Sequence, residues 1–592
     1  MNMYESQTTG RLSAIISNLV NIELEGPARQ NEICFIEHEG HRLMAEVIRI
    51  TGNVAQAQVF DSTRGLKINT PVVFTGHMLE ATLGPGLLSK KYDGLQNDLE
   101  KLPGLFLERG THSSPLDEDK EYNFIPLAKE GDVVSAGDWL GEVQEGWIPH
   151  KIMVPLTFKG QFRVGFISPS AVLRINDTVA ILLDQEGQEH KVTMVQRWPV
   201  KKAFLGYREK IRPDTILETG VRAIDTLNPL PEGGTGFIPG PFGCGKTVLQ
   251  HAISKNANAD LIVLVACGER ANEVVEIFKT FPELEDTRTG RKLIERTTIV
   301  CNTSNMPVAA REASVYTGMT IAEYYRSMGL KVLLLADSTS RWAQALREMS
   351  NRLEELPGPD AFPMDLTATI TAFYARAGKV ILKNGRTGSV TFLGTVSPAG
   401  GNLKEPVTES TRKAARCFYA LSQKRADSKR YPAIDPLDSY SKYLEYGEFR
   451  EKLNDIMAPG WAELVEEARD ILRQSSEARE QISILGDDSV PVDYHEIFWK
   501  GELIDFVILQ QDAFDKIDAN TPLARQVYML RLVLEICRQN FPFSHFEDVS
   551  SFFKKLIHLL KQMNYSAFAS ETFQRYEKEV RELIDEATKG RG

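Results

Sequence analysis

The eight residues Gly240-Pro241-Phe242-Gly243-Cys244-Gly245-Lys246-Thr247 constrain this chain more than any other segment, because they match the pattern GxxxxGK[ST] in full. A short apolar run over 234–238 precedes them, and the spacing of TVLQHAISKNA predicts a helix after them. Glycines in such a strand-to-helix turn let backbone N–H groups surround phosphate oxygens, and the helix N-terminus adds positive charge. The motif therefore predicts a nucleotide-binding site in an α/β domain.

Two side chains of this loop carry specific chemistry. Lys246 supplies a full positive charge for the β- and γ-phosphates, and Thr247 offers a hydroxyl group to Mg²⁺. Cys244 is either an oxidation switch or a small residue packed beneath the loop, and we favour the packed residue.

Two apolar runs elsewhere end in acidic residues. The run 331–336 leads into Asp337, a candidate magnesium ligand, and the run 261–267 leads into Glu269 and Arg270. Because ligand chemistry gathers at the carboxyl ends of parallel strands, we expect both carboxylates at one edge of the sheet. On spacing alone, Glu269 fits a solvated carboxylate at a helix start as well as it fits a catalytic group.

Patterning along the 592 residues predicts a multidomain α/β protein. Short apolar runs, such as 14–20, alternate with turns at Gly40 and Gly76 and predict an N-terminal β-barrel. The four predicted parts are an N-terminal β-barrel (1–76), a second β-rich module (110–198), a P-loop parallel-sheet domain (201–440) and a C-terminal helical bundle (441–592).

Composition narrows the functional classes. The chain has 69 basic and 80 acidic residues, a net charge of −11, which gives no support to a general electrostatic grip on nucleic acid. Its six cysteines are far apart and form no zinc-type motif, so we expect reduced thiols in a cytosolic protein. The longest apolar runs are well short of the ~20 residues of a membrane span. The first ten residues lack the features of a secretory signal.

Several long segments resemble the rotary ATPase family, specifically the catalytic A subunits of V-type and A-type ATPases. The resemblance extends over nearly the whole chain, and it implies that the module at 110–198 is inserted and that the P-loop parallel-sheet domain is RecA-like. The segments that carry it are GGTGFIPGPFGCGKT (233–247), GERANE (268–273), NTSNMPVAAREASVYTGMTIAEYYRSMG (302–329), ADSTSRWAQALRE (336–348), EPVTES (405–410) and YPAIDPLDSYS (431–441).

This resemblance assigns roles to individual residues. It implies that Glu269 activates the attacking water, that Arg270 organises the phosphate site and that Glu273 faces the water shell of Mg²⁺, which Thr247 and Asp337 help to hold. Arg341 would stabilise charge at the γ-phosphate; its alternative is an ordinary helix-surface arginine.

The base and phosphates of ATP or ADP would contact a second set of residues. Tyr431 resembles the aromatic residue on which adenine stacks, and Phe514 would close the pocket, although both also suit an ordinary core. The expected nucleotide-binding residues are Gly240, Pro241, Phe242, Gly243, Cys244, Gly245, Lys246, Thr247, Val248, Tyr431 and Phe514.

The resemblance also implies an assembly. It predicts ATP hydrolysis or synthesis coupled to H⁺ or Na⁺ transport, with an arginine of a neighbouring noncatalytic B subunit completing the site in an alternating A3B3 ring. Central and peripheral stalk subunits and a membrane ion-translocating sector would be further partners, nucleic acid would not, and the chain would lie peripherally on the cytoplasmic face of the membrane.

Three alternatives remain open on the sequence. An F-type β subunit or an export-apparatus ATPase is disfavoured by the module at 110–198. A RecA-like nucleic-acid translocase is disfavoured by the net charge. A noncatalytic ring subunit is disfavoured because Lys246, Thr247 and Glu269 are all present.

Overall fold

The computed structural model describes residues 8–101, 110, 112–304 and 306–589. The chain separates into two units, which we call unit 1 and unit 2. Unit 1 comprises Met1–Arg212, Ala259–Leu284 and Lys292–Gly394, and unit 2 comprises Pro213–Asn258, Glu285–Arg291 and Thr395–Gly592. Residues 1–7, 111 and 590–592, which the predicted barrel, module and bundle include, lie outside the described residues, and the four predicted boundaries remain predictions.

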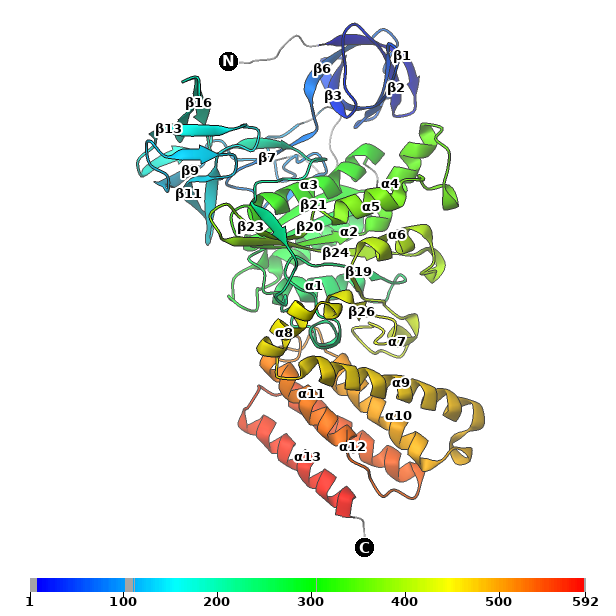
Figure 1. Cartoon of the computed structure of the whole chain (residues 1–592). Helices are drawn as coiled ribbons and strands as arrows, with labels where there is room; N and C mark the ends of the chain where they lie inside the picture. The colour runs from blue at the N-terminus through cyan, green and yellow to red at the C-terminus, as the bar shows by residue number, and fades with distance from the viewer. Residues whose placement is uncertain (1–7, 102–109, 111, 305, 590–592) are drawn as a thin grey trace. The chain divides into compact units, whose positions relative to one another are not determined.

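Unit 1 begins with the expected β-barrel. Six antiparallel strands close in the order β1-β2-β5-β4-β3-β6, because β1 also pairs with β6 (Figure 1). Residues on alternate positions point inward, and Leu12, Val20 and Ile22 are fully buried. The strands are β1 (Thr9–Ile16), β2 (Leu19–Leu24), β3 (Glu32–His38), β4 (His41–Thr51), β5 (Val54–Val59) and β6 (Pro71–Met78).

Two details of the barrel differ from the sequence expectation. The apolar run 14–20 is not one strand, because a tight turn at Ser17, whose φ is 56°, divides it between β1 and β2. Gly76 does not form a turn between elements; it lies inside β6, with φ 78°. Its N–H donates to buried Glu32 at 2.7 Å, where the register between β3 and β6 shifts, so this glycine belongs to an irregularity within the strand pair.

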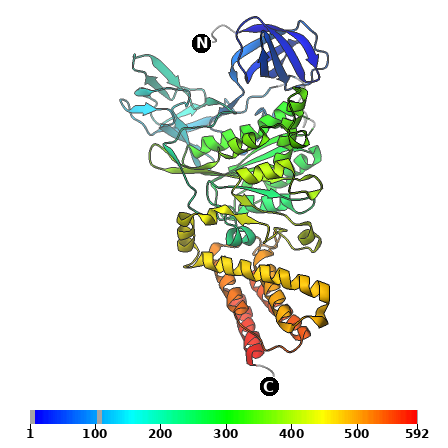
Figure 2. The ribbon, with the colours of Figure 1, turned by 45° about the vertical axis from the view of Figure 1, so that its right-hand side comes forward.

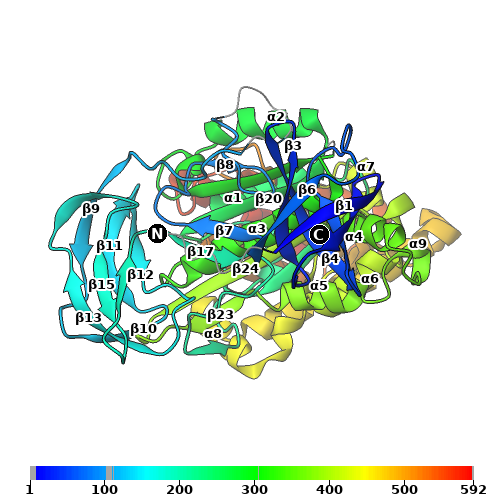
Figure 3. The ribbon, with the colours of Figure 1, turned by 90° about the horizontal axis from the view of Figure 1, so that it is seen from above.

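The inserted module of unit 1 consists of two four-stranded sheets, ordered β10-β13-β15-β16 and β12-β11-β9-β14 (Figure 3). Its strands are β9 (Glu121–Pro126), β10 (Val133–Ser135), β11 (Trp139–Glu145), β12 (Ile148–Met153), β13 (Gln161–Ile167), β14 (Ala171–Arg174), β15 (Ala180–Leu183) and β16 (Glu189–Val192). A two-stranded ribbon pairs β7 (Glu80–Leu83), which precedes the module in sequence, with β17 (Gln196–Pro199), which follows it.

The remainder of unit 1 is built on a parallel sheet in the order β24-β22-β20-β21-β8, as the apolar runs predict. Antiparallel β23 and β18 extend it beyond β24. These strands are β8 (Lys91–Tyr92), β18 (Glu209–Ile211), β20 (Leu261–Glu269), β21 (Thr297–Thr303), β22 (Lys331–Asp337), β23 (Gly378–Ile381) and β24 (Thr387–Val396). The helices of this part are α2 (Ala271–Thr280), α3 (Val308–Arg326), α4 (Thr339–Arg352) and α5 (Leu366–Tyr374).

Unit 2 contains the turn that carries the glycine-rich motif, together with the C-terminal helices. β19 (Thr235–Pro239) pairs in parallel with β25 (Cys417–Phe418), which pairs with β26 (Tyr440–Ser441). The short helices here are α1 (Lys246–Asn256), α6 (Pro406–Ala414) and α7 (Gln423–Asp427).

The C-terminal helices of unit 2 form the expected bundle (Figure 2). Apolar residues at helical spacing, including Leu530, Val533 and Phe553, are fully buried between the helices. The helices are α8 (Gly447–Ile456), α9 (Trp461–Leu485), α10 (Val492–Ile504), α11 (Leu523–Cys537), α12 (Phe546–Asn564) and α13 (Glu571–Lys589).

Candidate functional site

The glycine-rich loop of unit 2 lies between β19 and α1, as the sequence predicts. Gly243 and Gly245 have φ values of 86° and 84°, a left-handed conformation that favours glycine. Lys246 Nζ donates hydrogen bonds to Gly240 O at 2.7 Å and to Ser397 Oγ at 2.6 Å. The ammonium group is therefore folded back over the loop whose backbone would surround a phosphate.

Cys244 in the same loop is buried, and its thiol donates to Gln423 Oε1 at 3.2 Å. Burial raises the pKa of this thiol, while the charge of Lys246 acts in the opposite direction. A raised pKa suppresses the thiolate that oxidation requires, so the structure favours the packed residue over the redox switch.

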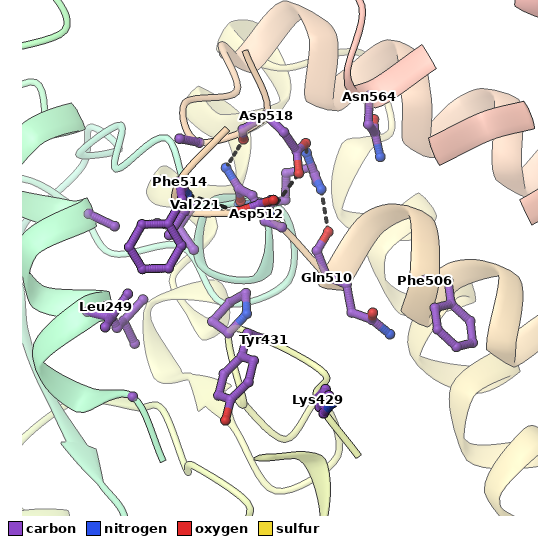
Figure 4. Close-up of a pocket in the computed structure, with 18 of the residues that line it drawn as sticks. Val221, Leu249, Lys429, Tyr431, Phe506, Gln510, Asp512, Phe514, Asp518 and Asn564 are labelled. Atoms are coloured by element: carbon purple, nitrogen blue, oxygen red, sulfur yellow. Dashed lines mark hydrogen bonds and ion pairs between the residues drawn. The ribbon is translucent and has the colours of Figure 1, made fainter. Parts of the chain in front are cut away.

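A cavity of about 470 Å³ adjoins this loop within unit 2. Of the expected nucleotide-binding residues, Gly243, Gly245, Val248, Tyr431 and Phe514 line it (Figure 4). The Tyr431 ring packs against Gly245, where an added Cβ would lie 3.6 Å from it. Phe514 is 85% exposed, which suits a flap over a ligand better than a core residue.

The remaining nucleotide-binding candidates do not line this cavity: Gly240, Pro241, Phe242, Cys244, Lys246 and Thr247. They form the rest of the strand-to-helix turn, where phosphates rather than a base would bind.

Arg222 organises the cavity wall, and the sequence analysis missed it. This buried guanidinium donates to the backbone oxygens of Ile508 and Gln510 and forms an ion pair with Asp518. Gln511 then donates its backbone N–H to Tyr431 O at 2.9 Å. Arg222 therefore holds the loop that bears Phe514, and that loop is tied to the segment that bears Tyr431.

The acidic candidates lie at one edge of the sheet in unit 1. β20 ends at Glu269 and β22 ends at Asp337, and these neighbouring strands are in parallel register with Ala266 opposite Asp337. The common direction of these two adjacent parallel strands therefore places both carboxylates at the same edge of the sheet.

The electrostatics of Glu269 set it apart from an ordinary surface carboxylate. Burial raises its pKa most, and the carboxylates of Glu273 and Asp337 raise it further, to about 9, although Arg341 opposes them. The protonated carboxyl of Glu269 donates a hydrogen bond to the Glu273 carboxylate, which lowers the pKa of Glu273. The pair thus shares one proton near neutral pH, and the interpretation of Glu269 as a solvated carboxylate is disfavoured.

Glu273 also has a structural role at the start of α2. Arg270 is the N-cap residue, and its backbone N–H donates to the Glu273 carboxylate, as in a capping box. The Arg270 side chain is exposed, and its charge lowers the pKa of Glu273.

Two arginines approach the strand end at Gly268. A Cβ at Gly268, whose φ is 68°, would lie 3.0 Å from both Arg311 Cδ and Arg341 Cβ. Arg311 is a further residue that the sequence analysis did not single out, and its Nε is buried without a hydrogen-bond partner in the described part of the chain. The edge therefore combines acidic groups with guanidinium groups, which can bind phosphate oxygens.

Unit 1 thus brings together four of the predicted residues, Glu269, Glu273, Asp337 and Arg341. Lys246, Thr247 and the cavity residues belong to unit 2. That both sets surround one triphosphate remains a prediction.

Two observations on the described residues concern metal binding and membrane spanning. Within the described ranges, no group of three or more His, Cys, Asp or Glu side chains is arranged to hold a metal ion. Across residues 8–101, 110, 112–304 and 306–589, every helix falls short of the length or apolarity that a membrane span requires.

Family models match four stretches of the chain. They describe the ATP synthase alpha/beta family beta-barrel domain (residues 12–76), the barrel-sandwich domain of its alpha/beta subunits (113–201), the family's nucleotide-binding domain (220–441) and the C-terminal domain of V and A type ATP synthase (450–547). The first three define the class of protein, and the fourth distinguishes V and A types from the F-type and export-apparatus alternatives.

Relatives matched over nearly their full length support the same family. A V-type ATP synthase alpha chain 1 of Treponema pallidum is 47% identical over 588 residues, 99% of this chain and 98% of the relative. A V-type ATP synthase alpha chain of Treponema denticola is 47% identical over 584 residues (98% and 97%), and one of Protochlamydia amoebophila is 46% identical over 590 residues (99% and 98%). The chain therefore belongs to the ATP synthase alpha/beta family, among the V-type alpha chains.

Proposed function

We propose that this chain is the catalytic subunit of a V/A-type rotary ATPase, which hydrolyses or synthesises ATP in a complex that moves H⁺ or Na⁺ across a membrane. Its family and the names of its full-length relatives support this function. The glycine-rich loop and the aromatic cavity of unit 2 support the binding of a nucleotide.

One observation carries the catalytic assignment, namely the environment of Glu269. A half-buried carboxyl with a raised pKa, beside Asp337 and Arg341 at a strand end, is suited to a general base. A subunit that only binds nucleotide would not need such a group.

In the proposed reaction, the glycine-rich loop holds the triphosphate and Glu269 orients a water molecule and accepts its proton. Lys246, Arg270 and Arg341 stabilise the charge on the transferred phosphoryl group. The guanidinium group of Arg341 favours the ionised form of Glu269, because opposite charge lowers a carboxyl pKa, whereas the negative charge of bound phosphates acts in the other direction.

The donor set suits Mg²⁺. Thr247 supplies a hydroxyl, and Glu273 and Asp337 supply carboxylates, all of them hard oxygen ligands that act directly or through water. Since the described residues contain no cluster of three metal-binding side chains, the ion would also depend on phosphate oxygens. When bound, Mg²⁺ neutralises charge on those phosphates.

We further propose that a noncatalytic B subunit completes the site with an arginine in an alternating A3B3 ring, joined by central and peripheral stalks to the ion-translocating membrane sector. The chain would then lie peripherally on the cytoplasmic face of a membrane. An arginine of this kind contributes about 10³ to 10⁵ in rate, so the isolated chain should be a weak ATPase that the B subunit activates.

The substitution Glu269→Gln tests the catalytic assignment. We expect it to retain MgATP binding in the assembled ring but to lose about 100-fold or more in turnover, because it removes a general base. Glu276→Gln is the matched control, since Glu276 is exposed on α2. Near wild-type turnover in Glu269→Gln would remove Glu269 from its role, and undiminished ATP binding in Lys246→Ala would refute the phosphate site.

A further inference from the structure

The cavity of unit 2 contains a polar side chain that the proposed reaction leaves without a role, the carboxamide of Gln510. Gln510 lines the cavity, and its Nε2 is buried without a hydrogen-bond partner in the part of the chain that the structure describes. A buried amide nitrogen without a partner costs free energy, so its position calls for a ligand that accepts a hydrogen bond.

The backbone holds Gln510 in place independently of its side chain. Its N–H donates to Asp505 O at 2.9 Å, and its carbonyl accepts from the Arg222 guanidinium. Because the main chain is fixed on both sides, a ligand that contacts the carboxamide has to order only the side chain.

The neighbouring Gln511 differs from Gln510, because its carboxamide has hydrogen-bond partners within the chain. Its amide nitrogen donates to Gly220 O at 2.8 Å and Asp518 O at 2.7 Å, and its side-chain carbonyl accepts from the Arg222 backbone N–H. Gln511 is thus engaged in holding the cavity wall.

Asn564 of α12 also lines the cavity, and its Oδ1 lacks a partner within the described residues. Its amide nitrogen already donates to Val507 O at 2.8 Å, so its unengaged atom is an acceptor. Gln510 has the unengaged donor.

The direction of the cavity indicates which part of a nucleotide Gln510 would meet. Gly243 and Gly245 line the cavity where phosphates would bind, and Phe506 and Lys561 line it as well. Figure 4 shows Leu249 and Phe514 on one side of Tyr431 and Gln510 and Phe506 on the other. A purine stacked on Tyr431 with its ribose toward the glycines would present its Watson–Crick edge away from the loop.

We propose that the Gln510 carboxamide contacts this edge and so contributes to the choice of base, an inference that rests on the proposed nucleotide binding. With adenine, Nε2–H donates to N1 and Oε1 accepts from the N6 amino group. A carboxylate at the same position could only accept. It would therefore suit the N1–H and N2–H donors of guanine and repel adenine N1.

The test compares MgATP and MgGTP affinities of the full-length chain by calorimetry. In Gln510→Glu, the ratio of GTP to ATP affinity should rise about tenfold or more, as expected for one gained and one lost base contact. In Gln510→Leu, ATP affinity should fall about fivefold through loss of a hydrogen bond. Gln481→Glu makes the same chemical change at an exposed position of α9 and should alter neither the affinity ratio nor the ATP affinity.

The affinity ratio is unaffected by partial misfolding, because misfolding lowers both affinities equally. An unchanged ratio in Gln510→Glu, or unchanged ATP affinity in Gln510→Leu, would overturn the inference. Failure of the proposed function looks different, because the unsubstituted chain would then bind neither nucleotide or would bind ATP just as well after Lys246→Ala.

Discussion

The substitution Gly268→Ala should damage catalysis without touching a catalytic side chain. The φ of 68° at Gly268 costs an alanine about 1 kcal/mol. The new Cβ would also lie 3.0 Å from Arg311 Cδ and Arg341 Cβ. Arg311 Cδ belongs to a flexible side chain, but Arg341 Cβ is fixed to α4, so the strand end or the helix must shift. Overpacking of this kind costs about 1–3 kcal/mol, which gives about 2–4 kcal/mol in total.

Gly290→Ala separates the two contributions. Gly290 also has a φ of 68°, but an added Cβ there would meet no atom within 4 Å, so only the conformational cost of about 1 kcal/mol applies. The assays are the thermal unfolding midpoint of the full-length chain and MgATP turnover in the assembled ring.

Because Glu269 follows Gly268 directly, a displacement of about 1 Å should lower turnover about 100-fold, whereas Gly290→Ala should retain it. Equal turnover and equal midpoints in the two variants would refute the reasoning.

Three further predictions concern protonation, stability and oxidation. Because burial and neighbouring carboxylates raise the pKa of Glu269, kcat/KM should rise with pH as Glu269 of the free enzyme loses its proton. Glu273→Gln should move this rise to lower pH, and an unmoved profile would contradict the pairing of Glu269 with Glu273. The folded chain holds this proton more tightly than the unfolded chain, so this group's contribution to the unfolding free energy should be present at acid pH and be lost as the pH rises toward the raised pKa. Arg222→Met should destabilise the chain by about 3–5 kcal/mol in urea, because it leaves Asp518 buried and unpaired, and a loss as small as that of a surface substitution would argue against the network. Cys244→Ser should leave turnover unchanged, and peroxide should inactivate the parent chain no faster than the variant; faster loss in the parent would restore the redox switch.

The elements around the motifs could be predicted because their signals are local. The run ending at Asp337 forms β22 with the expected end, and the residues after the glycine-rich loop form α1. Parallel strand direction then places Glu269 and Asp337 at one edge, which needs only the topology of the sheet.

Features that depend on tertiary contacts escaped the sequence analysis. The sequence predicts a turn at Gly76 because glycine is common in turns, but its φ belongs to a register shift against Glu32, which is 44 positions away in the sequence and lies on the paired strand β3. The two-residue strand β8 is too short to show periodicity. Arg222 stands in an apolar segment, an unusual place for arginine, but its partners lie almost 300 positions away.

The shared proton of Glu269 and Glu273 also could not be predicted from the sequence. Their spacing of four residues is common on helix starts, and only burial turns it into a raised pKa. The predicted site residues also divide between two units built from interleaved segments, an arrangement that composition and periodicity do not reveal.

The most direct test of the account is a structure of the chain assembled with its noncatalytic partner and bound to MgADP and aluminium fluoride. The account predicts that Lys246 and Asp337 both face the bound anion and its metal, and that Glu269 holds a water molecule about 3 Å from the transferred group. A structure in which Glu269 and the glycine-rich loop face separate cavities would contradict it.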